Sequence, residues 1–190
     1  MILNEFNYRR FRGRIHTLGN VETAITCSIF AAKKLFENSN IFGYPSFEEA
    51  AAGLRGEADD LLLVPAAYPG VGSFLMDERL ALRGATTFEI PALVACGRLG
   101  AHRYEKLFHH PATASLLPCI SCFTYGETVE VSSNEVAAHC MNEDDLRFAA
   151  VTNQLVAEHF NLPICQVLRR QRDMAWLLFA SEASECKESP

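Results

Sequence analysis

Tyr68 is the first residue of this sequence whose side chain and position together suggest chemistry. It follows an apolar run, 61–64, that ends at Pro65 and opens into Ala66 and Ala67. Such a run, with charges before it and turn residues after it, is typical of a buried parallel strand. Ligands of open α/β sheets bind at the carboxyl ends of their strands. We therefore expect a ligand site at this edge, where the Tyr68 phenol could hydrogen-bond a substrate hydroxyl or relay a proton.

Hydroxyl and amide side chains stand at three predicted helix starts, each of which follows a strand. They are Thr23, Thr26 and Ser28 at the first start, Ser132, Ser133 and Asn134 at the second, and Thr152 and Asn153 at the third. Free N–H groups at a helix start, together with such side chains, suit a carboxylate without a full positive charge. The same residue types also serve as ordinary helix caps. The sequence leaves both interpretations open: carboxylate ligands, or caps alone.

His110 precedes Pro111 at a predicted strand end, where it could orient a carboxylate or donate a proton. Cys119 and Cys122 form a lone C-x-x-C. No second pair of this kind and no helical His pair supports a zinc site, and the segment is predicted to be a helix packed on the core. The sequence therefore predicts no metal.

The elements that must position these side chains alternate between strand and helix patterns. The first part predicts strands at 14–18, 41–44 and 61–64, with helices at 25–36 and 47–54 between them. This β-α-β-α-β order indicates a parallel sheet. The second part predicts extended chain at 87–96, strands at 107–111, 128–131, 146–151 and 176–179, and helices at 113–123, 132–141 and 153–160. We expect two α/β lobes that are joined by crossing strands and enclose a cleft.

The composition is that of an ordinary globular protein, with 190 residues, 49% hydrophobic and 21% charged. The net charge of -6 argues against nucleic-acid binding, which needs clustered cations. No apolar run approaches the ~20 residues of a membrane span, and the start lacks the pattern of a signal peptide. The 7 cysteines, an odd number in mostly apolar settings, favour reduced thiols and a cytoplasmic protein.

A series of partial motifs follows one order along the chain. It consists of Thr26-Cys27-Ser28, residues 44–49, residues 56–59, Val64-Pro65, His110-Pro111, Ser133-Asn134 and residues 150–153. This series resembles the catalytic domain of prephenate dehydratases, which has the two-lobed type II periplasmic-binding-protein fold. The resemblance implies a single α/β catalytic domain over 1–180. Lobe 1 would take about 14–92 plus the C-terminal strand, lobe 2 about 93–165, and 181–190 would be a flexible tail.

Two motifs depart from that family. Dehydratases carry Glu-Asn-Ser after Val-Pro, where this chain has Ala67-Tyr68-Pro69, and end in Asn-x-Thr-Arg-Phe, where it has residues 175–179. The family's threonine is its proposed acid for expelling the ring hydroxyl, and Leu177 in that place cannot donate a proton. The chain is similar instead to the non-aromatising prephenate decarboxylases of bacilysin-type antibiotic pathways, which lack the C-terminal ACT domain. That similarity lies at 64–68, 74–76, His110-Pro111, 116–118, 174–176 and 178–179.

The resemblance implies a carbon–carbon lyase that decarboxylates prephenate without aromatising it, giving a dihydro-4-hydroxyphenylpyruvate for a specialised amino acid or antibiotic. It places Tyr68, His110 and Trp176 in catalytic roles, with no cofactor, in a cytoplasmic homodimer. Trp176 in an apolar wall would favour loss of CO2, although it could equally be core filler. The substrate-binding set would be Thr26, Ser28, Ala66, Ala67, Phe74, Ser133, Asn134, Thr152, Asn153 and Leu177.

Three alternatives remain open from the sequence. The first is a prephenate dehydratase that uses a displaced acid and gives phenylpyruvate. The second is a non-catalytic module of the same fold that binds a small carboxylate. The third is an enzyme of the decarboxylase branch whose substrate has changed.

Overall fold

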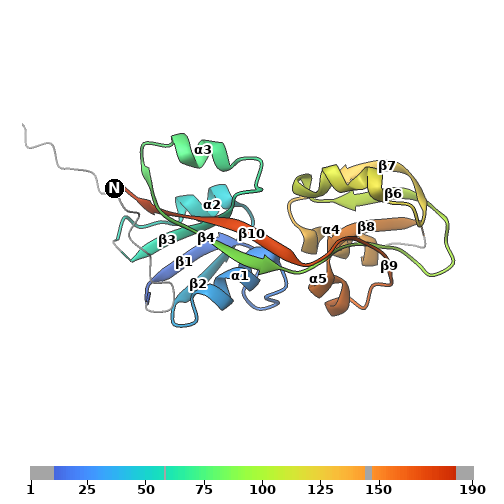
Figure 1. The fold of residues 1–190 in the computed structure, drawn as a ribbon, viewed down its shortest axis with the longest axis horizontal. Coiled ribbons are helices and arrows are strands. Elements are labelled where there is room, and N and C mark those ends of the chain that lie inside the picture. The colour runs from blue at the N-terminus through green and yellow to red at the C-terminus, as the bar shows by residue number, and fades with distance from the viewer. Residues whose placement is uncertain (1–10, 58, 144–146, 183–190) are drawn as a thin grey trace, which may run out of the picture.

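The structure is a computed structural model that describes residues 11–57, 59–143 and 147–182. Two five-stranded sheets lie along the long axis of the molecule, each with helices packed on it (Figure 1). Sheet A has the strand order β2-β1-β3-β10-β4, and sheet B has the order β7-β6-β8-β5-β9. This is the two-lobed α/β architecture that the sequence predicts.

Sheet A begins with a β-α-β-α-β unit whose three strands are parallel, as predicted. Side chains cap its first two helices: Thr26 accepts a hydrogen bond from the Ile29 N–H, and Ser46 accepts one from the Glu49 N–H. The strands of this sheet are β1 (Arg14–Leu18), β2 (Asn40–Tyr44), β3 (Asp60–Pro65), β4 (Leu80–Ile90) and β10 (Arg172–Ser181). Its helices are α1 (Cys27–Leu35), α2 (Phe47–Ala52) and α3 (Val71–Met76).

Sheet B is mixed: β6 pairs in parallel with β7 and β8, and β5 pairs antiparallel with β8 and β9. Its strands are β5 (Leu93–Cys96), β6 (Arg103–His109), β7 (Thr124–Glu130), β8 (Phe148–Asn153) and β9 (Ile164–Arg169). Its helices are the 3-10 helix η1 (Pro111–Cys119), α4 (Asn134–Glu143) and α5 (Gln154–His159).

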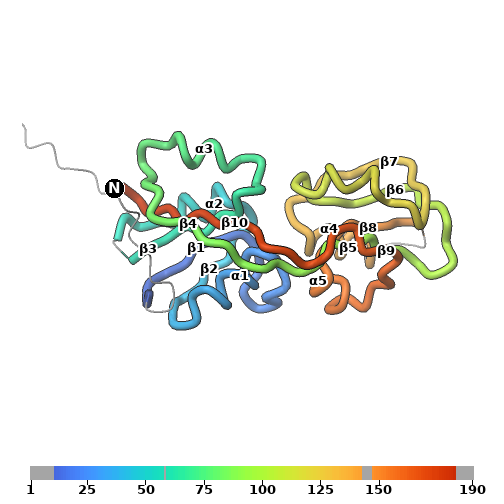
Figure 2. Tube along the Cα trace, in the orientation of Figure 1, coloured from blue at the N-terminus to red at the C-terminus, as the bar shows by residue number. Residues whose placement is uncertain are grey.

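Two stretches of chain cross between the sheets. The first leads from β4 to β5 through Pro91 and Ala92, and the second leads from β9 to β10 through Arg170 and Gln171. Figure 2 shows the two crossings running alongside one another between the sheets. Because β10 pairs antiparallel with both β3 and β4, this returning strand lies inside sheet A.

Neighbouring residues of β10 pack on opposite faces of sheet A, because side chains alternate along a strand. Trp176 and Leu178 belong to the hydrophobic core that includes α1. Leu177 and Phe179 belong to the core that includes α2 and α3. The strand therefore presents Trp176, and not Leu177, to the α1 side of the sheet.

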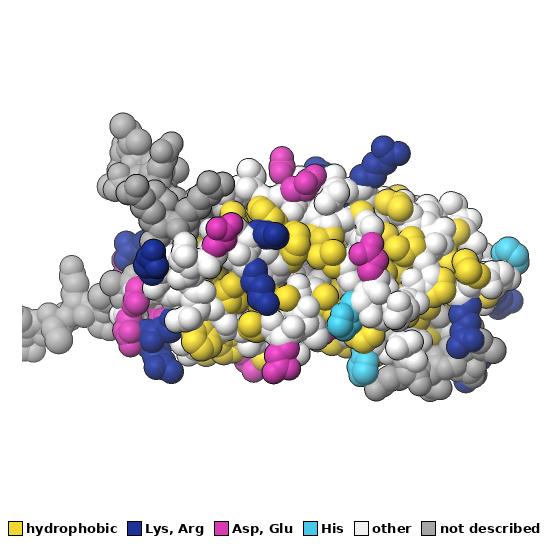
Figure 3. All heavy atoms as spheres, turned by 90° about the horizontal axis from the view of Figure 1, so that it is seen from below, with side chains coloured by type: hydrophobic (Ala, Val, Ile, Leu, Met, Phe, Trp, Pro, Cys, Tyr) yellow, Lys and Arg dark blue, Asp and Glu magenta, His cyan; other side chains and the backbone are white. Residues whose placement is uncertain are grey.

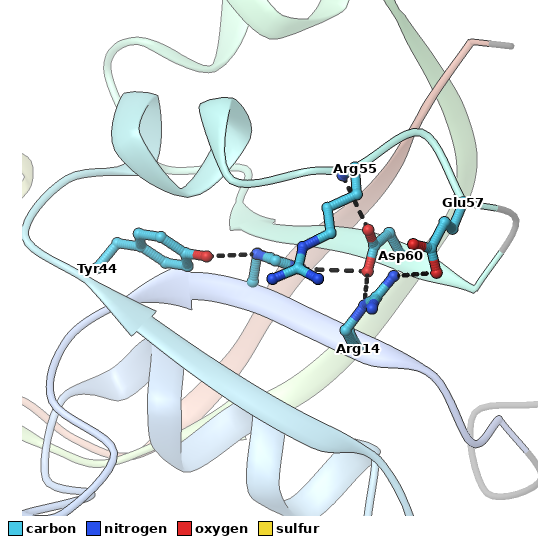
Figure 4. Close-up of polar contacts among 6 residues, drawn as sticks. Arg14, Tyr44, Arg55, Glu57 and Asp60 are labelled. Atoms are coloured by element: carbon cyan, nitrogen blue, oxygen red, sulfur yellow. Dashed lines mark hydrogen bonds and ion pairs between the residues drawn. The ribbon is translucent and has the colours of Figure 1, made fainter.

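A cluster of charged and aromatic side chains ties β1 to β2 and β3 (Figure 4). The His16 ring lies between Tyr44, with Nδ1 2.8 Å from the phenol oxygen, and Asp60, with Nε2 3.3 Å from Oδ1. Arg14 donates to both Asp60 and Glu57. Burial alone would raise the pKa of Asp60, but the hydrogen bonds from Arg14, the Arg55 N–H and His16 together outweigh it, and the pKa is lowered.

The structure corrects four expectations. α3 and β9 have no counterpart among the predicted elements. The segment predicted as a helix over 113–123 is instead η1, which contains Pro118; a proline has no N–H for the α-helical hydrogen bond. The predicted tail starts too early, because Ser181 pairs with Leu80 in β10. The rest of that tail, 183–190, lies outside the described residues.

Charges of both signs are scattered among hydrophobic side chains on the face seen in Figure 3. No helix of the described residues is both long enough and apolar enough to cross a membrane.

Candidate functional site

A cavity lies where the two sheets meet. Its volume is about 90 Å³, counted as space for the centres of water molecules. Sheet A contributes the ends of β1 and β3, the start of α1 and part of β10; sheet B contributes η1, the start of α4 and the end of β9. The lining residues predicted from the sequence are Thr26, Ser28, Ala67, Tyr68, His110, Ser133, Asn134 and Trp176. The structure thus brings together predicted residues that lie far apart in the chain.

Two helix starts form the polar side of the cavity. Thr26 caps α1, and its own hydroxyl donates to the Leu18 carbonyl at 3.3 Å. Ser133 precedes α4 and accepts a hydrogen bond from the Val136 N–H at 3.1 Å. These hydroxyls therefore do act as caps, and their helices point positive ends toward the cavity.

Arg169, at the end of β9, also lines the cavity. Its Nε is buried and has no hydrogen-bond partner in the part of the chain that the structure describes. Burial lowers the pKa of this guanidinium, and the neighbouring Arg172 lowers it further. No Asp or Glu lies among the described lining residues. The cavity therefore carries a net positive field, which favours an anion.

Apolar side chains form much of the remaining lining of the cavity. Pro65 and Ala67 come from the end of β3, Phe47 from α2, and Met174 and Trp176 from β10. Trp176 is fully buried, yet its indole Nε1 has no hydrogen-bond partner among the described residues. A ligand in this cavity would contact both polar or charged groups and hydrocarbon.

His110 is the histidine that lines the cavity. Its Nδ1 accepts a hydrogen bond from the Ala112 N–H at 3.2 Å. This assigns the proton of the neutral ring to Nε2. Burial lowers the pKa of His110, and the nearby His109 adds to that effect. The ring is therefore neutral near pH 7 and can both donate and, after tautomer exchange, accept a proton.

The Tyr68 hydroxyl is engaged outside the ligand space. It donates to Glu48 Oε1 at 2.8 Å, while its ring lies 4.7 Å from that of Phe47. Burial, and then the hydrogen bond to Glu48, raise the pKa of Tyr68 to about 12. The phenol can therefore accept a hydrogen bond from a ligand without giving up its own proton.

Cys27 was not considered a site residue from the sequence, yet it lines the cavity. Burial raises the pKa of its thiol to about 11, against the opposing effects of Arg169 and of the Asn153 and Asn134 amides. The side chain is thus a neutral thiol beside the cationic group. The other missed residues lining the cavity are Leu18, Phe47, Pro65, Ile90, Leu93, Ala112, Thr113, Arg169 and Met174.

Five predicted site residues do not line the cavity, and two of them support it from behind. Thr152 donates to the Asn134 carbonyl at 2.7 Å, which fixes the start of α4. Asn153 caps α5, accepting from the Val156 N–H at 2.9 Å, and donates to the Ile25 carbonyl at 3.0 Å. Their effect on a ligand would be indirect.

The other three point elsewhere. Ala66 is exposed, and its N–H donates to the Ala175 carbonyl. Phe74 lies on α3 and stacks on the far side of Tyr68, with ring centroids 6.2 Å apart. Leu177 packs beside Phe74 in the core under α2 and α3. The expectation that Leu177 faces the ligand in place of an acid is therefore not met, because the alternation of β10 turns it away.

The C-x-x-C pair lies away from the cavity. Cys119 is exposed at the end of η1, and Cys122 is partly buried. Within the described part of the chain, no group of three or more His, Cys, Asp or Glu side chains could hold a metal.

No protein-family model matches the chain, and no curated protein matches it either. Solved structures are similar to it. A prephenate dehydratase from Arthrobacter aurescens, in complex with L-Phe, has 16% identity and a TM-score of 0.60, over 93% of this chain and 63% of that one. The prephenate dehydratase of Staphylococcus aureus subsp. aureus Mu50 has 12% identity and a TM-score of 0.59, over 89% of this chain and 66% of that one.

The regulatory domain of OxyR2 from Vibrio vulnificus is also similar, with 9% identity and a TM-score of 0.52 over 99% of this chain and 94% of that one. The fold is that of the type II periplasmic binding proteins. The chain spans less than two thirds of the length of the two prephenate dehydratases, with 63% and 66% covered. At these identities the likeness establishes a prephenate dehydratase-like fold, shared by enzymes and by ligand-binding domains.

Proposed function

We propose that this protein binds prephenate in the cavity between its sheets and decarboxylates it without aromatising the ring. The reaction breaks the bond between the ring carbon and its carboxylate, releases CO2, and sends the electron pair into the diene. A ring carbon takes up one proton and the ring hydroxyl stays. The product is a dihydro-4-hydroxyphenylpyruvate.

One observation carries the proposal: three hydroxyls that line the cavity already donate their protons to acceptors of the protein. Thr26 donates to Leu18, Thr113 donates to the His110 carbonyl at 2.7 Å, and Tyr68 donates to Glu48. No carboxyl group lines the cavity within the described residues. A dehydratase must protonate the leaving hydroxyl, and these three hydroxyls do not offer it a proton. This replaces the argument from Leu177, which lies outside the cavity.

The remaining roles follow from the placement of the side chains. Arg169 and the starts of α1 and α4 would bind the carboxylates. Trp176 would form the apolar wall near the ring, where weaker hydration of the ring carboxylate favours loss of CO2. Tyr68 would lie beside the ring of the substrate, with its own hydroxyl proton held by Glu48. His110 would deliver the proton to the ring carbon from solvent.

The test is to incubate the protein with prephenate near neutral pH and weigh the product by mass spectrometry. Loss of CO2 alone supports decarboxylation, and a reaction in D2O should place one deuterium on a ring carbon. Loss of CO2 together with water would show a dehydratase instead. Because prephenate aromatises by itself in acid, a reaction without protein is the control.

A second function is favoured by one finding, the match of almost the whole chain to a regulatory domain. In that case the cavity would capture a small carboxylate and catalyse nothing. Saturable binding of prephenate without any release of CO2 would support this alternative.

The proposal also includes a single catalytic domain, with β10 (Arg172–Ser181) as its last strand, that acts in the cytoplasm as a homodimer and needs no cofactor. Light scattering coupled to size-exclusion chromatography tests the dimer. Activity of protein that has been dialysed against a chelator tests the absence of a metal requirement.

A further inference from the structure

Three buried polar atoms lack a hydrogen-bond partner among the described residues: Asn134 Oδ1, Arg169 Nε and Trp176 Nε1. In folded proteins such atoms are nearly always paired, so each unpaired one requires an explanation. All three residues line the cavity between the sheets. Because all three line one cavity, a bound ligand is the simplest source of their missing hydrogen-bond partners.

The three atoms differ in what they need. The N–H groups of Arg169 and Trp176 can only donate, whereas the Asn134 amide oxygen can only accept. They come from three separate elements, namely β9, β10 and the first turn of α4. A ligand that satisfies all of them must therefore carry acceptors on one part and a donor on another.

Each of the three is held in place by the fold. Trp176 is fully buried in the core with α1. The Asn134 carbonyl is fixed by Thr152, and its amide lies close enough to the Cys27 thiol to affect the thiol pKa. Arg169 acts on the same thiol by its charge. Cys27 is thus near both Asn134 and Arg169, and all three line the same cavity.

We propose that Arg169 and Trp176 bind a carboxylate of the ligand and that Asn134 accepts a hydrogen bond from a ligand hydroxyl. The preferred ligand is then a hydroxylated carboxylic acid. This rests on the proposed function for the position of the site, and it adds the residues that determine specificity. An amide oxygen accepts the hydrogen of a hydroxyl and supplies no proton to the oxygen, which agrees with retention of that hydroxyl.

The test compares two acids that differ by one hydroxyl, 4-hydroxyphenylpyruvate and phenylpyruvate. Their dissociation constants are measured by isothermal titration calorimetry. Trp176 is the 1 tryptophan of the chain, so quenching of intrinsic fluorescence reports the same binding in the unaltered protein. We expect the unaltered protein to bind the hydroxylated acid about 5-fold more tightly, the effect of one neutral hydrogen bond.

Each variant has its own expected pattern. Asn134→Ala should abolish the preference while leaving the affinity for phenylpyruvate unchanged. Arg169→Gln should weaken the binding of both acids by about 10- to 100-fold, as expected for the loss of a charged hydrogen bond. Trp176→Phe should weaken the binding of both acids by about 5-fold, the effect of one neutral hydrogen bond. Asn142→Ala, an exposed position of the same helix α4, is the matched control and should change neither affinity.

Three results would overturn the inference: a preference that survives Asn134→Ala, unchanged affinities in Arg169→Gln, or no binding of either acid by the unaltered protein at millimolar concentration. The Arg169 and Asn134 variants keep the test decisive if Trp176→Phe does not fold. A protein that shows the expected pattern but releases no CO2 from prephenate would contradict the proposed function alone. A decarboxylase that still binds the hydroxylated acid more tightly after Asn134→Ala would contradict this inference alone.

Discussion

The side-chain amide of Asn153, at the end of β8, donates a hydrogen bond to the backbone carbonyl of Ile25, 3.0 Å away in the loop before α1. Both groups are buried. The same side chain caps α5 through the Val156 N–H. A second link between the lobes runs from the Thr23 hydroxyl to Glu135 at 3.1 Å. These bonds hold the two helix starts on either side of the cavity.

Asn153→Ala should lower the free energy of unfolding by about 2 kcal/mol. About 1 kcal/mol comes from the lost cap of α5, and about 1 kcal/mol from the bond to Ile25. Urea unfolding measures the change. Ser46→Ala, which removes only the cap of α2, is the control and should cost about 1 kcal/mol. Equal losses in the two variants would mean that the bond to Ile25 contributes no stability.

Leu177→Thr should leave the product of the reaction with prephenate unchanged. The new hydroxyl would lie in the core with Phe74 and Phe179, and none of these three positions lines the cavity. The half-buried leucine would lose contacts, so unfolding should become easier by about 1 kcal/mol. Mass spectrometry of the product checks the first part and urea unfolding the second. The appearance of phenylpyruvate would show that this residue reaches the substrate.

Tyr68→Phe should lower kcat for prephenate by less than about 10-fold. The phenol donates its hydrogen bond to Glu48, so toward the ligand it can act only as a hydrogen-bond acceptor. A side chain that supplied the proton in the transition state would contribute about 100-fold or more. Steady-state kinetics distinguishes the two cases. A loss of the larger size would assign the proton transfer to Tyr68.

Glu48→Gln should lower the pKa of Tyr68 from about 12 while leaving it above the ordinary value of 10.0. Burial of the phenol persists in this variant, but the charged acceptor is gone. The ultraviolet absorbance of ionised tyrosine, followed against pH, measures the shift. The difference from a Tyr68→Phe titration isolates this residue among the 5 tyrosines. An unchanged pKa would mean that Glu48 does not bind the phenol in solution.

Stability should fall as the pH drops below 6.5, the ordinary pKa of histidine. Burial lowers the pKa of His16 in the folded protein, outweighing the attraction of Asp60. The unfolded chain then binds more protons than the folded one, so the stabilisation present above 6.5 is lost as the pH falls toward the folded pKa. Asp60, with its lowered pKa, adds a further loss only below its ordinary 3.8.

Urea midpoints at about pH 7.5 and about pH 5.5 measure this effect. His16→Gln should reduce the difference between the two midpoints, and His110, whose pKa is also lowered by burial, accounts for part of what remains. A midpoint that rises on acidification would contradict the assignment of a neutral, buried His16.

The sequence was informative wherever a local pattern decides the structure. The β-α-β-α-β order and the turn after β3 were predicted, and a helix cap was one of the two interpretations given for Thr26. Hydrophobic periodicity and capping residues act within a few positions of the chain, so they can be recognised without knowledge of its partners. From these patterns, Tyr68 and His110 were expected near a ligand, and both line the cavity.

Tertiary structure decided which residues face the cavity. Trp176 and Leu177 are neighbours, and a shift of one residue along β10 would exchange their faces, so only the pairing with β3 and β4 assigns them. Arg169 could not be found because β9 has no strong local pattern and forms a strand by pairing with β5, far away in the chain. Its charge reaches the cavity only when the crossing strands bring both sheets together, since burial and electrostatics depend on contacts that span the whole chain.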